Sequence, residues 1–583
     1  METVDLIIIG AGWNGLVTAK TALEFDPSLT LLILESSSSV GGVWSKDRLY
    51  KGLQTNNVLG SYEYSDFAMI DVIPSLQAGQ HIPGEDVHTY LKAYTEHFDL
   101  ANKIRLNYLV ESVEYTPEKS WVVRGIDGSK DLSERPDYEI LTPKLILATG
   151  LTSQGRIPAF EGQEFFEAPL FHVRDFALHQ GSVTNQGTPV TILGGGKSGW
   201  DAVYACASTG REVNWVIRES GHGPIWMMPK LVTPFKLLLE NLPATRVVSL
   251  FSPCVWTDPG DRFSFVRRFL HGTWLGRKLV GVFWGLVERE LVQSNRYEEH
   301  EETQKLRPWI GPFWVSTVIG VLNYPTDLFG LVRKGTLKIH IADITKLTPN
   351  TVHLSNGNTV RSSALVLCTG WKATPNIRFS PEGIEERLGF PWATDPVDQD
   401  LVKLARKEIF DKFADLRNPP IQNTQLKPLS TVRDSVTLHP FRLARFIAPV
   451  AMWEDRSVTF SGNISTFHTP LVAEVQALWA AVYLYHGLAR QETHASILWD
   501  TVLHTEFCGL RSPAGYGGRN ADFVFDVLPY LDILLRDLGL RPRRKGSLWG
   551  NLFHPHGGED YRGLVGEWKD LHKDIDRIDC DCD

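Results

Sequence analysis

The most constraining stretch of this chain is its N-terminus, where an apolar run from Val4 to Ile9 leads directly into the turn sequence GAGWNG. Helix-forming residues follow, so the predicted order is strand, glycine turn, helix. In such a unit Gly10 makes the tight turn, Gly12 lets the backbone approach a pyrophosphate, and Gly15 lets the helix pack against the strand. The helix N-terminus, with Asn14 in its first turn, presents unpaired N–H groups to phosphate oxygens. This stretch predicts a dinucleotide site.

The residues that follow extend the predicted site. A second strand, Leu29–Leu34, ends at Glu35, the place where an acid holds the hydroxyls of a free ribose. A glycine pair that includes Gly42 comes next and is followed by Trp44, which offers another place where backbone can lie against a ligand. We therefore expect Glu35, Gly42 and Trp44 to contact the same bound nucleotide.

The same pattern occurs a second time. A strand is predicted at Val190–Leu193, GGGKSG follows, and after a helix over 200–208 the strand Val213–Ile217 leads to Arg218. Arg218 stands in the second unit where Glu35 stands in the first. An arginine at this position favours a nucleotide with a 2′-phosphate, because a guanidinium pairs with phosphate. A solvated strand-end charge is the alternative interpretation of Arg218. The residues of this second turn that are predicted to bind a cofactor are Gly194, Gly196, Lys197, Ser198 and Gly199.

Three later strand ends also carry turns. Two apolar strands end in Ala-Thr-Gly and Cys-Thr-Gly, and each predicts a sharp turn beside a cofactor, at Thr149 and Gly150 in the first and at Thr369 and Gly370 in the second. A third strand ends at Gly462, just before a predicted helix. A glycine there lets the helix N-terminus approach a bound ring, although packing alone would also explain it.

The spacing of these motifs predicts an α/β fold with two Rossmann-like dinucleotide-binding domains, the second inserted in the first. At 583 residues the chain is too long for one core. Residues 222–330 interrupt the strand–helix alternation and are predicted to form a helical insertion, with helices near 233–241 and 277–293. The predicted domains are 1–165 and 376–490 for the first unit, 166–375 for the second, and 491–583 for a C-terminal extension.

Composition narrows the class of protein. A net charge of −9 argues against a nucleic-acid partner and against a polybasic membrane anchor. None of the six cysteines forms a C-x-x-C pair, which favours free thiols in a reducing compartment. Because the first strand begins almost at once, we expect no secretory signal and a cytoplasmic protein. For Cys580 and Cys582, in the acidic tail, a solvated tail is expected rather than a metal or redox site.

One stretch without charge, residues 308–326, approaches the length that spans a membrane. It is interrupted by Gly311, Pro312, Gly320, Asn323 and Pro325. Such breakers predict a buried loop-and-helix cap and no transmembrane segment, with peripheral membrane contact as the alternative.

Together these features resemble those of the flavin-containing monooxygenase family, within the class B flavoprotein monooxygenases. Between its two glycine fingerprints that family carries F-x-G-x-x-x-H-x-x-x-(Y/F). This chain matches it at Phe166, His172 and Phe176, with Ala168 in place of the glycine. A closing Phe rather than Trp favours this branch over the related Baeyer–Villiger enzymes. The Cys-Thr-Gly-Trp turn resembles the family's second A-T-G-Y motif, and the tail resembles that of larger fungal members, many of which act in secondary metabolism.

The resemblance implies an FAD- and NADPH-dependent monooxygenase. In such enzymes NADPH reduces FAD, and O2 adds to the reduced flavin as a hydroperoxide that delivers one oxygen atom to the substrate. Asn56 resembles the family's active-site asparagine and is the candidate donor beside the flavin. For His172 a structural hydrogen-bonding role is favoured over that of a general acid. Arg174 either lies near the nicotinamide nucleotide or forms a surface ion pair.

The sequence leaves the substrate and the type of oxygenation open. The aromatic insertion favours a bulky apolar substrate, while oxygenation of a soft nucleophile, Baeyer–Villiger oxygenation of a ketone and alkene epoxidation all fit. A disulfide-reductase-like enzyme shares both fingerprints but needs a redox cysteine pair. A catalytically silent flavin-binding regulator is the remaining alternative. No metal site is expected.

Overall fold

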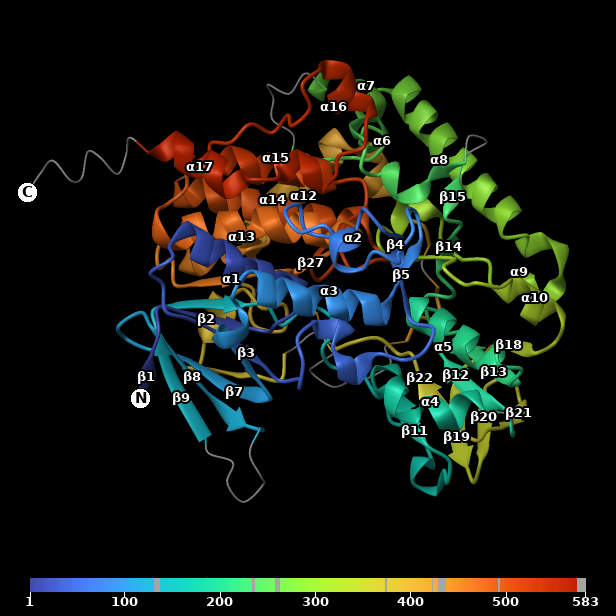
Figure 1. Ribbon diagram of the computed structural model, residues 1–583. Helices are drawn as coiled ribbons and strands as arrows, with labels where there is room; N and C mark the ends of the chain where they lie inside the picture. The colour runs from blue at the N-terminus through green and yellow to red at the C-terminus, as the bar shows by residue number, and fades with distance from the viewer. Residues whose placement is uncertain are drawn as a thin grey trace, which may run out of the picture.

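In the computed structural model, two parallel sheets carry the two glycine turns, and a layer of helices from the C-terminal part of the chain covers the first of them (Figure 1). The tail that holds Cys580 and Cys582 lies outside the described residues. The structure describes residues 1–129, 137–185, 187–232, 236–256, 263–372, 375–421, 423–427, 437–490 and 493–573.

The first parallel sheet carries the N-terminal turn on its central strand. Its strands lie in the order β26 (Val458–Phe460), β10 (Lys144–Leu147), β2 (Leu6–Ile9), β3 (Leu31–Glu35) and β6 (Ile104–Leu106). Strand β2 is apolar and buried throughout, as is usual where helices cover a parallel sheet. The sheet is covered by α1 (Trp13–Phe25), which packs against α13 (Thr469–Tyr485). The predicted strand, turn and helix at the N-terminus are confirmed.

The second parallel sheet repeats this arrangement strand for strand. Its order is β11 (Leu170–His172), β22 (Leu365–Leu367), β12 (Val190–Leu193), β13 (Val213–Ile217) and β18 (Leu337–Ile341). Strand β12 takes the central place of β2, and α5 (Lys197–Ala207) follows it as α1 follows β2. The predicted α/β fold with two Rossmann-like units is confirmed.

A third sheet joins the N-terminus of the chain to strands that come before and after the second sheet in sequence. Its order is β1 (Glu2–Thr3), β9 (Asp137–Thr142), β8 (Trp121–Asp127), β7 (Tyr108–Tyr115) and β23 (Arg378–Ser380). Strands β23 and β26 follow the second sheet in sequence yet pair with strands that precede it. The chain therefore leaves the first unit and returns to it; the residue limits assigned above to each domain remain a proposal.

Within residues 222–330, the stretch predicted to form the insertion, one predicted helix is confirmed and one is wrong. Helix α8 (Trp274–Ser294) covers the helix expected near 277–293. Near 233–241, the described residues instead form β16 (Leu237–Leu238), which pairs with β15 (Leu231–Val232), and a 3-10 turn. A short apolar run does not distinguish helix from strand, and here the pairing partner decides. The other elements are β14 (Trp226–Met228), α6 (Arg246–Ser249), α7 (Ser264–Gly272), α9 (Glu301–Gln304), β17 (Ile319–Val321) and α10 (Leu328–Arg333).

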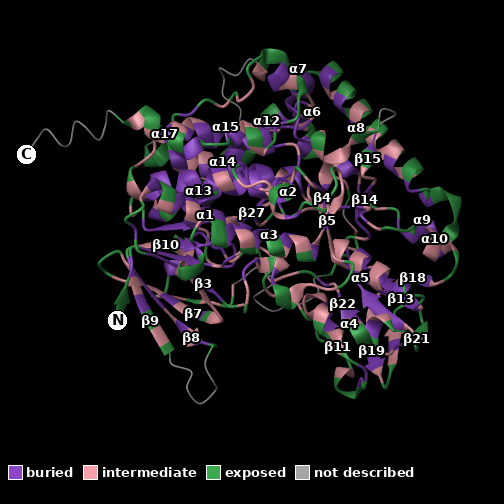
Figure 2. Cartoon of the chain, in the orientation of Figure 1, coloured by how far each residue is buried: buried purple, intermediate pink, exposed green. Residues whose placement is uncertain are grey.

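The C-terminal extension is part of the core. Its α14 (His494–Arg511) and α15 (Val527–Asp537) lie over α13, and residues of all three helices belong to one apolar cluster; Figure 2 shows much of this layer in the colour of buried residues. Its strand β28 (Ala521–Phe523) pairs with β27 (Ile464–Thr466), which follows the first sheet. Two further helices, α16 (Leu548–Phe553) and α17 (Leu564–His572), end the described chain.

The remaining elements lie around these layers. The N-G hairpin predicted near Asn356 is confirmed, between β20 (Thr351–Leu354) and β21 (Thr359–Arg361). The other strands are β4 (Gln54–Val58), β5 (His81–Pro83), β19 (Ile344–Thr348), β24 (Leu443–Ala444) and β25 (Ala448–Pro449). The other helices are α2 (Met69–Val72), α3 (Gly84–His97), α4 (Phe176–Thr184), α11 (Ile384–Arg387) and α12 (Gln399–Lys412).

Candidate active site

The first glycine turn is built so tightly that two of its positions accept only glycine. Gly10 has a φ of +111°, and a Cβ added there would lie 2.5 Å from the carbonyl oxygen of Ala148. A Cβ added at Gly15 would lie 1.9 Å from the carbonyl oxygen of Gly10. These contacts seat the N-terminus of α1 at the end of β2, beside the end of β10.

The second turn has the same geometry. Gly194 has a φ of +132°, and its added Cβ would lie 2.3 Å from the carbonyl oxygen of Cys368. A Cβ at Gly199 would lie 2.2 Å from the carbonyl oxygen of Gly194. The helix-capping glycines differ from these, because a Cβ at Gly12 meets its nearest neighbour at 3.6 Å and one at Gly196 meets nothing within 4 Å. A Cβ at either capping glycine would therefore meet no clash.

A cavity of about 1150 Å³ opens at the C-terminal ends of the strands of the first sheet. Its walls carry one acid, Glu35, and many cations. The predicted residues that line it are Gly10, Gly12, Asn14, Glu35, Gly42, Thr149, Gly150, Arg218, Thr369, Gly370 and Gly462. The cations that line it are Arg48, Arg156, Arg174, Arg218, Lys427 and Arg519. A cavity of this size and charge suits phosphate-bearing nucleotides.

Glu35 is held in place by backbone donors. Its two carboxylate oxygens accept hydrogen bonds from the N–H groups of Ala11 and Ser37, each at 2.8 Å. The side chain is buried except for its edge on the cavity. Since a carboxylate offers about four acceptor positions, these two bonds leave capacity for ribose hydroxyls.

Gly462, just after β26, lies against the first turn. Its φ is +78°, and an added Cβ would lie 2.3 Å from the amide nitrogen of Asn14. The neighbouring Ser461 hydroxyl lies 3.0 Å from that of Thr18 on α1. Gly42 makes a comparable approach, because an added Cβ there would lie 3.2 Å from Gly12 Cα. The three segments thus form one wall of the cavity.

The comparisons with known proteins agree with this geometry. A family model described as flavin-binding monooxygenase-like matches residues 4–252. The chain is 32% identical to the FAD-dependent monooxygenase DEP4 of Alternaria brassicicola, over 98% of its own length and 96% of the relative's. It is 33% identical to the FAD-dependent monooxygenase resA of Aspergillus sclerotiorum, over 97% of its own length and 98% of the relative's. The chain belongs to the flavin-binding monooxygenase-like family.

The predicted resemblance and the predicted enzyme class, a flavoprotein monooxygenase, are therefore confirmed. Among solved structures, the open crystal structure of cyclohexanone monooxygenase is similar with a TM-score of 0.59, covering 92% of this chain and 98% of that one. At 16% identity this likeness shows the fold alone. In the described part of the monooxygenase no helix is both long and apolar enough to cross a membrane.

Several predicted cofactor residues do not line the large cavity. Trp44 instead donates its indole N–H to the hydroxyl of Tyr62, at 3.3 Å. The second turn is covered, since the N–H of Ile225 donates to the carbonyl oxygen of Gly195 at 3.1 Å. Lys197 of that turn donates to the carboxylate of Asp201, and to a side-chain amide and a hydroxyl of residues 323 and 324. The predicted residues away from the cavity are Gly15, Trp44, Asn56, Gly194, Gly196, Lys197, Ser198 and Gly199.

Arg218 lies on the cavity wall, but it is already engaged. Its Nη2 donates to the carbonyl oxygen of Lys427 at 2.6 Å and to the hydroxyl of Ser220 at 2.8 Å, while its Nε lies 3.5 Å from Asp343 Oδ1. A guanidinium has five N–H donors, so these contacts orient the group and leave capacity for an anion. The location suits the predicted 2′-phosphate contact.

Asn56 lies on β4, half-buried, behind the cavity wall. Its side-chain oxygen accepts a hydrogen bond from the N–H of Val321 in the insertion, at 3.4 Å. Nearby, Asn323 donates to the carbonyl oxygen of Thr55 at 3.0 Å. The insertion is thus tied to the strand that carries Asn56, and the amide N–H2 group of Asn56 is the part that would donate to a ligand.

His172 is a buried structural group at the end of β11. Its Nδ1 accepts a hydrogen bond from the Arg174 N–H at 3.1 Å, so its Nε2 carries the proton and donates to the Gly370 carbonyl oxygen at 3.0 Å. Burial lowers the pKa of His172 to about 4. The ring is therefore neutral near pH 7, which fits the structural role and not that of a general acid. The Arg174 guanidinium donates to Ser153 O and borders the cavity.

The sequence did not reveal the part that the C-terminal extension plays. Tyr516 and Arg519 line the cavity, although they lie far along the chain from both fingerprints. Their sequence context, GYGGR, was the available signal. Behind the cavity residue Ser465, the Thr317 hydroxyl lies 2.7 Å from Ser465 Oγ and donates to the Asp522 carboxylate. Burial raises the pKa of Asp522 to about 6, against the effect of that hydrogen bond.

Proposed function

We propose that this monooxygenase uses FAD and NADPH to insert one oxygen atom of O2 into a bulky apolar organic substrate. The observation that carries the proposal is the cation-rich cavity, which both Thr-Gly turns border together with the capping glycine of α1. FAD would lie with its pyrophosphate at Gly12 and its ribose at Glu35. NADPH would enter from the side of Arg218. When bound, FAD supplies the reaction of a reduced flavin with O2.

The residues of the chain would position the two cofactors and exclude water. The turns at Thr149 and Thr369 meet at the cavity, because the N–H of Arg156 donates to the carbonyl oxygen of Gly370 at 2.9 Å. This pairing fixes the distance between the two Rossmann-like units. Closing such a site against water protects a reactive flavin from unproductive decay.

Two other activities are disfavoured. A disulfide reductase needs a pair of reactive cysteines, whereas the four described cysteines are free thiols: Cys206, Cys254, Cys368 and Cys508. Burial raises the pKa of Cys368, the one nearest a cofactor turn, well above its usual range. A catalytically silent flavin-binding protein would not need a second intact glycine turn, the one predicted to bind NADPH. We further propose secondary metabolism as the setting, from the similarity to fungal monooxygenases.

The proposal is tested with purified protein. We expect a flavin absorbance spectrum, oxidation of NADPH and consumption of O2, with labelled oxygen from O2 recovered in a product when apolar amines, sulfides, ketones and alkenes are screened. The product class decides between oxygenation of a soft nucleophile, Baeyer–Villiger oxygenation and epoxidation. Flavin binding without NADPH-dependent O2 consumption for any substrate would leave only the silent regulator.

Arg218→Ala is expected to weaken use of NADPH by about 1.5–3 kcal/mol, the range for a hydrogen bond to a charged group. The use of NADH, which lacks the 2′-phosphate, should hardly change. The measurement is kcat/KM for flavin reduction with each nicotinamide. Equal losses for the two cofactors would show that Arg218 only ties Lys427 and Ser220 in place.

Asn56→Leu is expected to uncouple the enzyme. It keeps the approximate volume of the side chain and deletes the amide donor, so folding and FAD content should persist. Loss of one preorganised donor where charge develops costs about 3 kcal/mol. We expect NADPH oxidation to continue with release of hydrogen peroxide in place of product. A variant as well coupled as the parent would make Asn56 a structural residue held by Val321.

A further inference from the structure

A second surface lies away from the cavity, on the outer sides of α7, α8 and α16. We name it the apolar edge, and it is defined by the exposed side chains of Phe265, Trp274, Leu279, Val282, Leu286 and Trp549. Its three aromatic members are 73%, 69% and 73% exposed, in chain order. Side chains with exposed fractions this large project into the solvent. The helices that carry them lie along one border of the molecule (Figures 1 and 2).

The apolar edge follows the helical repeat of α8 and lies over a packed apolar cluster. On α8 the members Leu279, Val282 and Leu286 recur at helical spacing, while Val280 and Trp284 are buried on the opposite side of the same helix. Beneath the surface, residues of α7 and α8 share one apolar cluster, against which Leu552 of α16 also packs. The exposed face is therefore held in one position, and it leaves apolar side chains without cover.

The charge around the apolar edge is opposite to that of the whole chain. Residues 264–287 contain no Asp or Glu, although the chain has a net charge of −9. Within that stretch Arg268 and Lys278 are exposed, and the Lys278 ammonium lies 5.9 Å from the centre of the Trp274 ring. The nearby acid Asp415 is paired with Arg277, at 3.3 Å. Within residues 264–287 the side chains that carry a full charge beside the apolar edge are thus all cations.

We propose that the apolar edge docks on the surface of an anionic phospholipid membrane. The aromatic and aliphatic side chains would enter the boundary between headgroups and acyl chains, where Trp is favoured, and Arg268 and Lys278 would meet the anionic headgroups. A second copy of the chain is a poorer occupant. A two-fold contact through this face would bring the same cations of both copies together without an acid from residues 264–287 between them.

The apolar edge is not the segment for which the sequence left peripheral membrane contact as an alternative. The uncharged stretch 308–326 is mostly buried or half-buried, with Trp309 and the residues at 325–326 exposed. Its apolar side chains pack within the insertion, so it offers little area to a membrane. The apolar edge is formed instead by helices whose sequence contains charges, but whose charges lie beside the apolar stripe.

The test is cosedimentation of the full chain with vesicles. We expect binding to vesicles of phosphatidylcholine and phosphatidylserine, weaker binding to phosphatidylcholine alone, and release as salt is raised. Trp274→Ser and Phe265→Ser should each weaken binding by about tenfold, and the double variant Arg268→Glu, Lys278→Glu should remove the preference for the anionic vesicles. The matched control is Leu178→Ser on α4, which is 77% exposed on another face and should bind as the parent does.

Three results would overturn the proposal. The first is that the parent binds neither vesicle. The second is that Leu178→Ser weakens binding as much as Trp274→Ser. The third is that the parent fails to bind and sediments as a dimer that Trp274→Ser converts to a monomer, which would assign the face to a second copy. None of these results depends on FAD, NADPH or substrate, so they are independent of the proposed function.

Discussion

Gly12→Asp is expected to abolish FAD binding while the fold persists. The added Cβ meets its nearest neighbour, Gly42 Cα, at an ordinary contact distance of 3.6 Å, and the φ of Gly12, −85°, suits any residue. Aspartate is also a favourable cap for the N-terminus of α1. Its carboxylate, however, would stand where the pyrophosphate is proposed to bind, so two anions would meet. The absorbance spectrum of the purified variant reports its flavin content, which should fall from stoichiometric to none.

Two further variants serve as controls. One tests whether the charge or the size of the new side chain causes the loss of FAD, and the other makes the same change at the second glycine turn. Gly12→Asn has nearly the same size and capping ability without the charge, and it should keep most of the FAD. Gly196→Asp makes the same change at the N-terminus of α5, where a Cβ has no neighbour within 4 Å; it should keep FAD and lose reduction by NADPH. A folded Gly12→Asp protein with full FAD would contradict the first site. Normal reduction in Gly196→Asp would mean that NADPH does not use the second turn.

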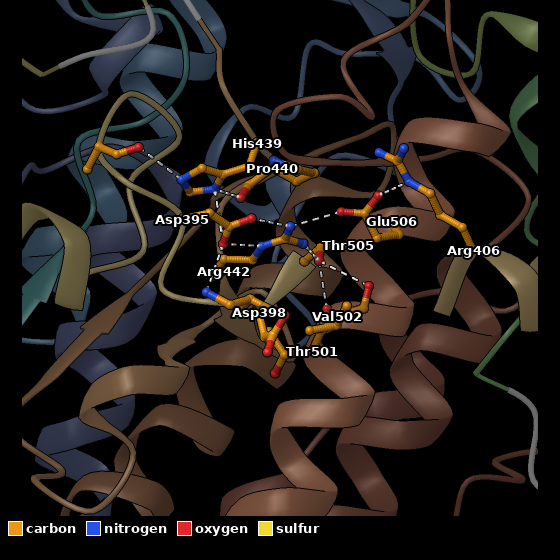
Figure 3. Close-up of polar contacts among 12 residues, drawn as sticks. Asp395, Asp398, Arg406, His439, Pro440, Arg442, Thr501, Val502, Thr505 and Glu506 are labelled. Carbon is orange, nitrogen blue, oxygen red and sulfur yellow. Dashed lines mark hydrogen bonds and ion pairs between the residues drawn. The ribbon is translucent and has the colours of Figure 1, made fainter. Parts of the chain in front are cut away.

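The second large effect concerns stability, at Arg442, a buried arginine directly before β24 (Figure 3). Arg442 is 1% exposed and donates to both oxygens of Asp395, at 3.0 and 2.7 Å, while its Nη2 lies 2.9 Å from Glu506 Oε1 on α14. Its Nη1 donates to the hydroxyl of Thr505 at 2.7 Å. Burial opposes the charge, but the two carboxylates outweigh it and raise the pKa of Arg442.

Arg442→Ala is therefore expected to lower the free energy of unfolding by about 3–5 kcal/mol, because the buried Asp395 would lose its arginine and Glu506 would keep only the exposed Arg406. Denaturant unfolding followed by circular dichroism measures the change. Arg406 is the matched control, since it binds the other oxygen of the same Glu506, at 2.7 Å, but is 54% exposed. Arg406→Ala should cost about 0–1 kcal/mol. Comparable losses from the two variants would refute the argument that burial decides the effect.

This network also shows why the extension could not be placed from sequence. Nothing local relates Asp395, Arg442 and Glu506, which are spread over more than a hundred positions of an otherwise ordinary charge pattern. Their pairing depends on α14 lying against the loop that leads to β24. Similarly, Tyr516 and Arg519 reach the cavity only because β28 pairs with β27.

Local sequence was sufficient where chemistry imposes short-range geometry. The first turn needs glycine at Gly10 and Gly15, because a Cβ there would overlap the carbonyl oxygens of Ala148 and Gly10, and the motif therefore predicts its own strand, turn and helix. The second fingerprint did the same for β12 and α5. Repetition of that unit was enough to predict the two parallel sheets, whereas the enzyme class was predicted from the family resemblance carried by Phe166, His172 and Phe176.

Only the tertiary structure decided which predicted residues face one another. It placed Gly12, Glu35 and Arg218 on one cavity, while Asn56 and Lys197 lie behind its wall, held by residues of the insertion. It also placed the exposed apolar side chains on α7, α8 and α16 rather than on the uncharged stretch 308–326. The physical reason is the same in each case: a glycine turn is determined by neighbours in sequence, whereas burial is determined by the segments that pack against a residue, and these come from anywhere in the chain.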